Sequence, residues 1–300
     1  MALLRSFASR GPWSFGGQAR KVGALLVIAA AGFSCEDSGR TAGTASVTIK
    51  GRKIALTVFA TEKDRRSAPL ACTTLPDGRG YLLLWPRERF AKLEPMADSY
   101  DVAFLDRSGK VVDLAKLDRA DPEGVVPAVE AAAALLVPSG DLAKMGVAKG
   151  DAATISGAPA AQDLPTMKIG GVAANVELAL TEPERNHGLM FRPRMSAEDG
   201  MLFAYEDEHA GISFWMMNTL IPLDIAFFKA DGTLINVNET PIAADPRREP
   251  VPRSPAADSA RYVLEMNLGW FKKKGLVGAD GKVKPGVKAE FPPQAPRGSF

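Results

Sequence analysis

The chain has 300 residues, 46% hydrophobic and 24% charged, which is typical of globular proteins and long enough for two domains of ordinary size. Its 37 basic and 35 acidic residues give a formal net charge of +2, too balanced for a protein that binds phosphate backbones, so no nucleic-acid partner is expected. The two cysteines, Cys35 and Cys72, exclude a disulfide framework and a zinc site with four thiolates.

Residues 1–35 have the features of a signal peptide, with the basic pair Arg20-Lys21 before a short apolar run at 22–33. That run is shorter than the about 20 residues needed to cross a bilayer. The segment ending at Cys35 resembles a bacterial lipobox, which predicts a lipoprotein tied to the membrane through Cys35, with residues 36–46 as a tether. The alternative is ordinary cleavage near Ala31, which leaves a soluble exported protein whose two thiols could pair. Either reading predicts a periplasmic or cell-envelope location.

The remainder of the chain contains two copies of one domain. Segment 49–65 parallels segment 169–185 at an offset of 120 residues, and further matches follow in the same order at offsets of 120, 123 and 129. Collinear matches with growing offsets indicate a tandem duplication with insertions in loops. We predict four regions beyond the tether: a degenerate first copy at 47–156, a linker at 157–166, the second copy at 167–284 and a Pro-rich tail at 285–300.

Each copy is predicted to be mostly β, because short runs rich in β-branched and aromatic residues alternate with turn signals. Segment 181–184 has the pattern of a capping box with Pro in the first turn, and segment 61–64 repeats it, so a short helix is expected after each. Asp231-Gly232 indicates a hairpin, and a second short helix is expected at 268–274. The predicted fold class is therefore mostly β, or β-rich α+β: two tandem copies of a compact barrel-like domain with one or two short helices each.

An ordered set of motifs marks the second copy: Gly188 to Met190, Gly200 to Phe203, Phe214 to Met216, Pro222 to Ile225 and Tyr262 to Glu265. This set resembles domain of unknown function 192, also called uncharacterised protein family 0127. The first copy resembles a degenerate member of the same family. The resemblance implies a mostly β domain, often exported or membrane-tethered, with no agreed biochemical activity. Two positions depart from the family pattern, Met217 in place of Lys and Leu268 in place of Ala.

Comparison of the two copies distinguishes residues that serve the fold from residues that serve a site. Polar residues present in both copies are predicted to be structural, and an interior Asp is normally hydrogen-bonded or paired. Asp224 is therefore expected to bind backbone N–H groups or Arg185. The residues kept in both copies are Thr181, Arg185 and Asp224, which recur as Thr61, Arg65 and Asp101.

Five polar or aromatic residues of the second copy are all replaced in the first copy. Because they were lost together, we predict that they lie close together in the folded domain. They are Arg192, Trp215, Asn218, Glu265 and Asn267; the first copy has Cys72, Lys92, Pro95, Leu136 and Pro138 in their places. Arg192 could pair with Glu265, or bind an anionic ligand beside the Trp215 ring and the two amides. The alternative is a polar network that braces the second copy.

The preferred hypothesis is a non-catalytic envelope module that binds a small molecule or an envelope protein, without cofactor or metal. The only histidines, His187 and His209, lack ligand partners at close spacing, so a zinc or His-based catalytic site is not expected, and His187 is expected on the exposed face of its helix.

Two alternatives stay open at this stage. An envelope hydrolase would use Glu265 and Asp224 for acid–base chemistry. A Cu(I)-binding protein would use the thioethers of Met216 or Met217.

Overall fold

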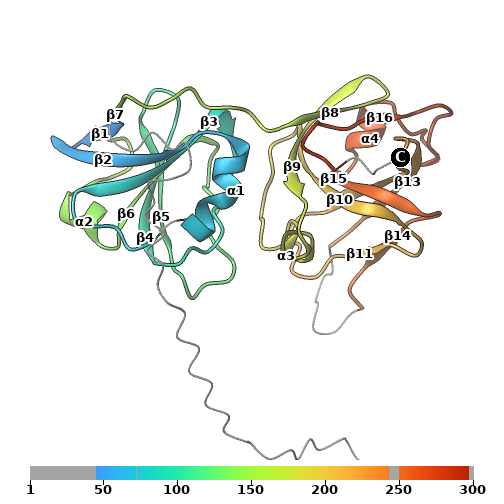
Figure 1. Ribbon diagram of the computed structural model, residues 1–300, viewed down its shortest axis with the longest axis horizontal. Coiled ribbons are helices and arrows are strands. Elements are labelled where there is room, and N and C mark those ends of the chain that lie inside the picture. The colour runs from blue at the N-terminus through green and yellow to red at the C-terminus, as the bar shows by residue number, and fades with distance from the viewer. Residues whose placement is uncertain (1–44, 72, 243–249, 297–300) are drawn as a thin grey trace, which may run out of the picture. The chain divides into compact units, whose positions relative to one another are not determined.

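The computed structural model describes residues 45–71, 73–242 and 250–296, and its elements are mostly strands. Two seven-stranded sheets, one in each copy, curl into half-barrels (Figure 1). This confirms the predicted fold class of two tandem barrel-like domains. The predicted signal peptide, Cys35 and Cys72 lie outside the described residues. No helix in the described part of the chain is long and apolar enough to cross a membrane.

The first copy forms one sheet in the order β5-β4-β6-β3-β2-β1-β7. Strands β2 and β3 are parallel, because α1 crosses between them, and the other neighbours are antiparallel. In chain order the elements are β1 (Ser46–Ile49), β2 (Arg52–Phe59), α1 (Glu62–Ala71), β3 (Arg79–Arg89), β4 (Tyr100–Leu105), β5 (Val111–Leu117), β6 (Ala131–Pro138), α2 (Asp141–Lys144) and β7 (Ala153–Ser156).

The second copy repeats this topology in the order β13-β12-β15-β10-β9-β8-β16, with β9 and β10 parallel around α3. It adds a two-stranded sheet of β11 and β14. The elements are β8 (Thr166–Ile169), β9 (Val172–Ala179), α3 (Glu182–His187), β10 (Asp199–His209), β11 (Ser213–Trp215), β12 (Leu223–Phe228), β13 (Leu234–Thr240), β14 (Arg253–Pro255), β15 (Ala260–Asn267), α4 (Trp270–Lys273) and β16 (Ala289–Glu290).

Strand β16 lies in the segment expected to be a tail. Ala289 and Glu290 pair with Ile169 and Lys168 of β8, and Phe291 stacks on Tyr262 with a ring-centroid distance of 3.8 Å. Residues after 284 therefore complete the second sheet and cover part of its core.

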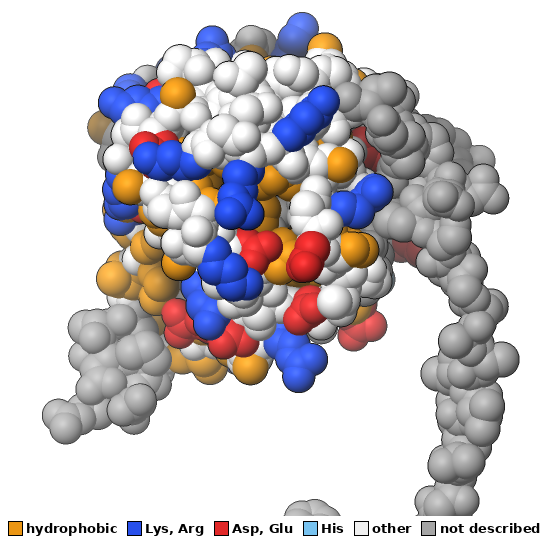
Figure 2. All heavy atoms as spheres, turned by 90° about the vertical axis from the view of Figure 1, so that its left-hand side faces the viewer, with side chains coloured by type: hydrophobic (Ala, Val, Ile, Leu, Met, Phe, Trp, Pro, Cys, Tyr) orange, Lys and Arg blue, Asp and Glu red, His pale blue; other side chains and the backbone are white. Residues whose placement is uncertain are grey.

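Each sheet carries an apolar cluster on both of its faces, which follows from the alternation of side chains along a strand. In β15, for example, Leu264 and Met266 belong to one cluster and Val263 to the other. On the face of the molecule drawn in Figure 2, Lys and Arg side chains lie among Asp and Glu side chains, as the balanced charge suggests.

The aspartates that recur in both copies bind a helix start. The two carboxylate oxygens of Asp224 accept hydrogen bonds from the N–H groups of Gly269 (2.9 Å) and Phe271 (3.0 Å), at the first turn of α4. Asp101 accepts from two N–H groups at the start of α2 in the same way. Because these N–H groups have no partner within the helix, the carboxylate replaces the missing carbonyls.

The recurring Arg and Thr also make equivalent contacts. Arg185 donates to the carbonyls of Leu180 and Ala204, and Arg65 ties the end of β2 to β3 in the first copy. Thr181 and Glu184 form the predicted capping box of α3, and Thr61 forms its counterpart with Asp64 at α1.

Candidate functional site

A row of four side chains crosses the second sheet. Met201 of β10 lies opposite Glu177 of β9 and Glu265 of β15, and Ile225 of β12 lies opposite Glu265. Paired residues point to the same face of a sheet, so the two glutamates share a face that is otherwise apolar. The equivalent row of the first copy is Thr57, Tyr81, Leu136 and Val102, which carries no charge.

Arg192 neutralises one of the two glutamates. Its Nη1 and Nη2 donate to Glu177 Oε1 (2.6 Å) and Oε2 (2.9 Å), and only 2% of the Arg192 surface is exposed. Burial alone would lower the pKa of Arg192, but the Glu177 carboxylate outweighs it and the pKa is raised. Burial would likewise raise the pKa of Glu177, and Arg192 instead holds it below its usual range. The pair is therefore ionised, and Arg192 pairs with Glu177 rather than with Glu265.

Two of the predicted site residues hold the loop that carries Arg192. Phe191 has a φ of 57° and donates its N–H to the carbonyl of Asn218 (2.8 Å), which itself has a φ of 52°. Asn tolerates this left-handed conformation better than most residues. Asn267 Nδ2 donates to the carbonyls of Met195 and Ser196 on the other side of Arg192. Asn218 acts through its backbone and Asn267 through its amide, and both position Arg192.

Glu265 is a buried carboxyl with an unusual environment. It is 5% exposed and forms no hydrogen bond or ion pair with any described residue. Desolvation raises its pKa to about 8, against a smaller opposing effect of Arg192. Glu265 is consequently neutral near pH 7. The charge of Arg192 lowers its pKa slightly, but the two side chains form no hydrogen bond.

Trp215 does not join this group. It is 45% exposed at the end of β11, with the guanidinium of Arg253 at 5.8 Å from its ring. The structure thus gathers Arg192, Asn218, Glu265 and Asn267 around one loop and places Trp215 apart.

Asp224 and Glu265 lie on opposite faces of the second sheet. Asp224 is paired with Met266, the residue after Glu265, and successive residues of a strand point to opposite sides. The two acids therefore share no cleft, and the arrangement gives no support to a hydrolase that uses them together. Met216 packs in the apolar cluster with Met195 and Met201. No group of three or more His, Cys, Asp or Glu suited to a metal occurs among the residues that the structure describes.

A cavity of about 780 Å³ lies beside the charged row, and both copies line it. Glu177 and Met201 of the second copy belong to its wall. Its apolar lining comes from Leu83, Trp85, Ala91, Pro95, Pro122, Leu164, Leu178, Ala179, Pro183 and Met201, and its charged lining from Glu62, Arg65, Arg66, Arg89, Lys92, Glu94, Glu177, Glu184 and His187.

A cluster of charged groups joins the two copies at this cavity. Lys92 Nζ lies 2.7 Å from His187 Nε2, 2.9 Å from the carbonyl of Met190 and 3.1 Å from Glu94 Oε2. Glu94 Oε2 is also 3.1 Å from His187 Nε2. Burial lowers the pKa of Lys92, although Glu94 opposes it. His187 was expected on an exposed helix face, but it lies half-buried against the first copy.

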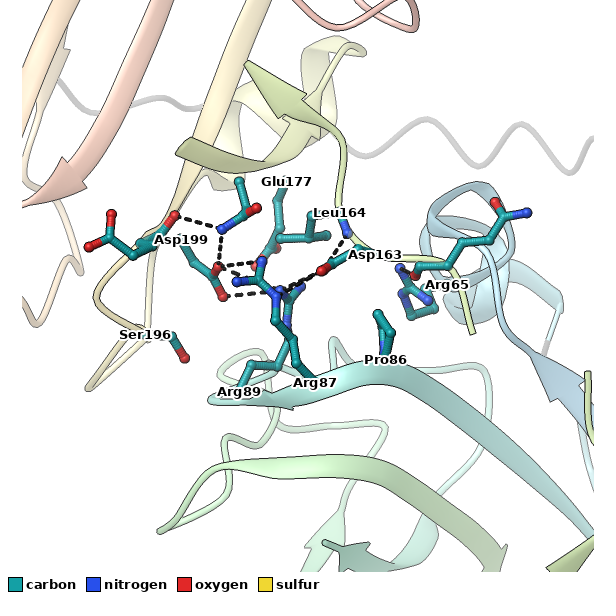
Figure 3. A network of polar contacts seen from close by, with 12 residues as sticks. Arg65, Pro86, Arg87, Arg89, Asp163, Leu164, Glu177, Ser196 and Asp199 are labelled. Atoms are coloured by element: carbon teal, nitrogen blue, oxygen red, sulfur yellow. Dashed lines mark hydrogen bonds and ion pairs between the residues drawn. The ribbon is translucent and has the colours of Figure 1, made fainter. Parts of the chain in front are cut away.

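Arginines of β3 pair with Asp163 of the linker and with Asp199 of the second copy (Figure 3). Arg87 Nε pairs with Asp163 (2.8 Å), and the Nη2 group of Arg89 lies 3.2 Å from Asp163 and 3.3 Å from Asp199. Arg66 adds a further link from α1 to Glu184. The contacts between the copies described here are thus largely ionic.

Sequence reasoning missed Glu177, Lys92 and Glu94 as members of this region. Glu177 could have been found, because Thr57 takes its place in the first copy and the same comparison identified Arg192. Lys92 and Glu94 gave no comparable signal, since they act only where the first copy meets the second.

The fold and site define a tandem pair of half-barrel domains with a cavity between them and a charged row in the second. The family model of domain of unknown function 192, described as "Uncharacterized ACR", matches residues 165–282. These residues are a domain of that family, as the motifs predicted. No curated protein matches the chain.

Two crystal structures are similar to this chain. A protein of unknown function from Novosphingobium aromaticivorans is 33% identical, over 42% of this chain and 84% of its own, with a TM-score of 0.36. A protein of Sinorhizobium meliloti, described as a candidate transcription regulator, is 29% identical, over 43% of this chain and 97% of its own, with a TM-score of 0.34.

Proposed function

We propose that the protein is an exported, lipid-anchored envelope module that binds a small molecule in the cavity between its two copies. The observation that carries this proposal is the cavity itself. Its volume of about 780 Å³ lies within the range of about 300–1,000 Å³ that is usual for small-molecule sites. Its wall combines apolar side chains with a few charged groups, which is the composition expected where a ligand is both desolvated and oriented.

The cavity also gives the first copy a role. That copy has lost the charged row of its own sheet, but it supplies Trp85, Lys92 and Glu94 to the shared cavity. The second copy supplies Glu177, held by Arg192. A binding site built by both copies explains why a degenerate first copy is useful, whereas a site within the second copy alone would not need it.

A cavity-filling variant tests the binding function. Pro95 lines the cavity and is half-buried, so Pro95→Trp places an indole there without rearranging the core. Pro76→Trp, at an exposed position outside the cavity, is the matched control. A panel of sugars, nucleotides, amines and carboxylates is added to the full chain in thermal-shift measurements, because a ligand that binds the folded state raises Tm by mass action.

We expect at least one compound to raise Tm of the parent protein and of Pro76→Trp, and to have no effect on Pro95→Trp. A compound that stabilises all three proteins equally binds elsewhere. If no compound distinguishes Pro95→Trp, the cavity is not the binding site.

The anchor is tested separately. The apolar run at 22–33 followed by Cys35 supports lipidation, which would hold the protein in the membrane fraction. Cys35→Ala should move the protein from the membrane fraction to the soluble exported fraction and abolish incorporation of labelled fatty acid. An unchanged distribution would favour ordinary signal cleavage instead.

A further inference from the structure

We infer that the cavity takes a neutral, hydroxyl-rich molecule with an apolar face, which is the chemistry of a saccharide. This rests on the proposed binding function and concerns the class of ligand.

The cavity presents carboxylates. Side-chain exposure is 34% for Glu94, 33% for Glu177 and 32% for Glu184. Lys92 and Arg89 line the same cavity but are 0% and 4% exposed. Two other arginines of the wall, Arg66 and Arg65, are partly exposed but already bonded. Arg66 Nε and Nη2 donate to Glu184, and the Arg65 guanidinium donates to the carbonyls of Ala60, Leu84 and Gln162. The surface thus offers mainly hydrogen-bond acceptors to a ligand.

These carboxylate oxygens can accept further hydrogen bonds. An ionised carboxylate has about four lone-pair sites and donates nothing. Each Glu177 oxygen accepts one bond from Arg192, and Glu94 Oε1 has no hydrogen bond among the described residues. A ligand that fits must therefore bring donors, either hydroxyl and amide groups or an ammonium.

The local charge balance decides between these donors. Lys92 neutralises Glu94, Arg192 neutralises Glu177 and Arg66 neutralises Glu184. The fourth glutamate of the wall, Glu62, lies 3.6 Å from Arg66 and near Arg65. Since each of these carboxylates has a cationic neighbour and they leave no net negative charge, a cationic ligand would lose its hydration without a Coulombic gain. A neutral donor needs no such compensation, because each hydroxyl replaces a bond to water by a charge-assisted bond to a carboxylate.

The rest of the wall suits the C–H faces of a sugar ring. Leu83, Trp85, Leu178 and Met201 line the cavity together with Pro95, and they can pack against flat apolar surface. The cavity volume of about 780 Å³ is large enough for more than one ring. An oligosaccharide is therefore expected to bind more tightly than a single sugar.

The test titrates the full chain with three probes: N,N′,N″-triacetylchitotriose as the neutral saccharide, spermidine as the cation and octanoate as the carboxylate. Thermal shift and tryptophan fluorescence are followed in the parent protein, Pro95→Trp and Glu94→Gln. Glu88→Gln, an exposed carboxylate of the same copy outside the cavity, is the matched control. The Tm without ligand shows whether each variant is folded.

We expect triacetylchitotriose to bind the parent and Glu88→Gln equally, to lose about 10-fold in affinity with Glu94→Gln, and to lose binding with Pro95→Trp. Binding of spermidine or octanoate alone, blocked by Pro95→Trp, would overturn the saccharide inference and leave the proposed function standing. If none of the probes or panel compounds shows binding that depends on Pro95, both fail.

Discussion

The two copies have the same strand order, yet one face of their sheets is built from different chemistry. In the second copy Glu177 and Glu265 cross this face, and Arg192 covers Glu177. In the first copy Tyr81 occupies the central position, with ring centroids of Phe59 and Tyr100 each at 5.9 Å. The same sheet face therefore carries an aromatic cluster in the first copy and an ion pair in the second.

This difference shows that the fold does not require the charged row. The helix-start aspartate, the arginine beside the short helix and the capping threonine make equivalent contacts in both copies, so these belong to the scaffold. Replacing a buried ion pair by packed apolar groups is often neutral or stabilising. The second copy thus carries an arrangement that its scaffold could dispense with, which is consistent with a role in binding.

Removal of Arg192 is expected to have the largest effect on stability. Arg192→Met leaves Glu177 without its partner, which typically costs 3–5 kcal/mol for a buried pair; because Glu177 is one-third exposed, we expect about 3 kcal/mol. Urea denaturation measures the free energy of unfolding. The double variant Arg192→Met/Glu177→Met, which removes both charges, should recover most of that loss. A cost for the single variant below about 1 kcal/mol would show that the pair does not brace the second copy.

Glu265 should make stability depend on pH. Its pKa of about 8 in the folded state exceeds the ordinary value of 4.5, so the folded protein binds the proton more tightly than the unfolded chain. The free energy of unfolding should therefore fall as pH rises from about 4.5 to about 8, by up to a few kcal/mol at about 1.4 kcal/mol per pKa unit, and level off above that.

Glu265→Gln keeps the shape and removes the titration, so the slope between these pH values should decrease. It should decrease rather than vanish, because burial also raises the pKa of Glu62, Asp199 and Asp224. Glu265→Leu, which introduces the residue of the first copy, should give the same result. A slope that neither substitution alters would mean that Glu265 is solvated in the folded state.

Much of the scaffold was predictable because its signals are local or repeated. The capping box of α3 needs only the spacing from Thr181 to Glu184, and the tandem organisation follows from self-comparison. The partner of Arg192 was not predictable, because Glu177 meets it through the register of β9 and the path of a loop. The cavity could not be predicted from the sequence for the same reason, because Lys92 and His187 come into contact only when one copy packs against the other.

The smallest expected effect tests how alike the scaffolds are. Thr61→Ala and Thr181→Ala each remove the side-chain cap of one short helix, which typically costs about 1 kcal/mol. The cap contact is 3.1 Å in the first copy and 3.4 Å in the second, so Thr61→Ala should cost slightly more. Thr→Ser at either position retains the hydroxyl and is the control. A loss at one position only, measured by urea denaturation, would show that one copy has ceased to depend on this cap although it keeps the contact.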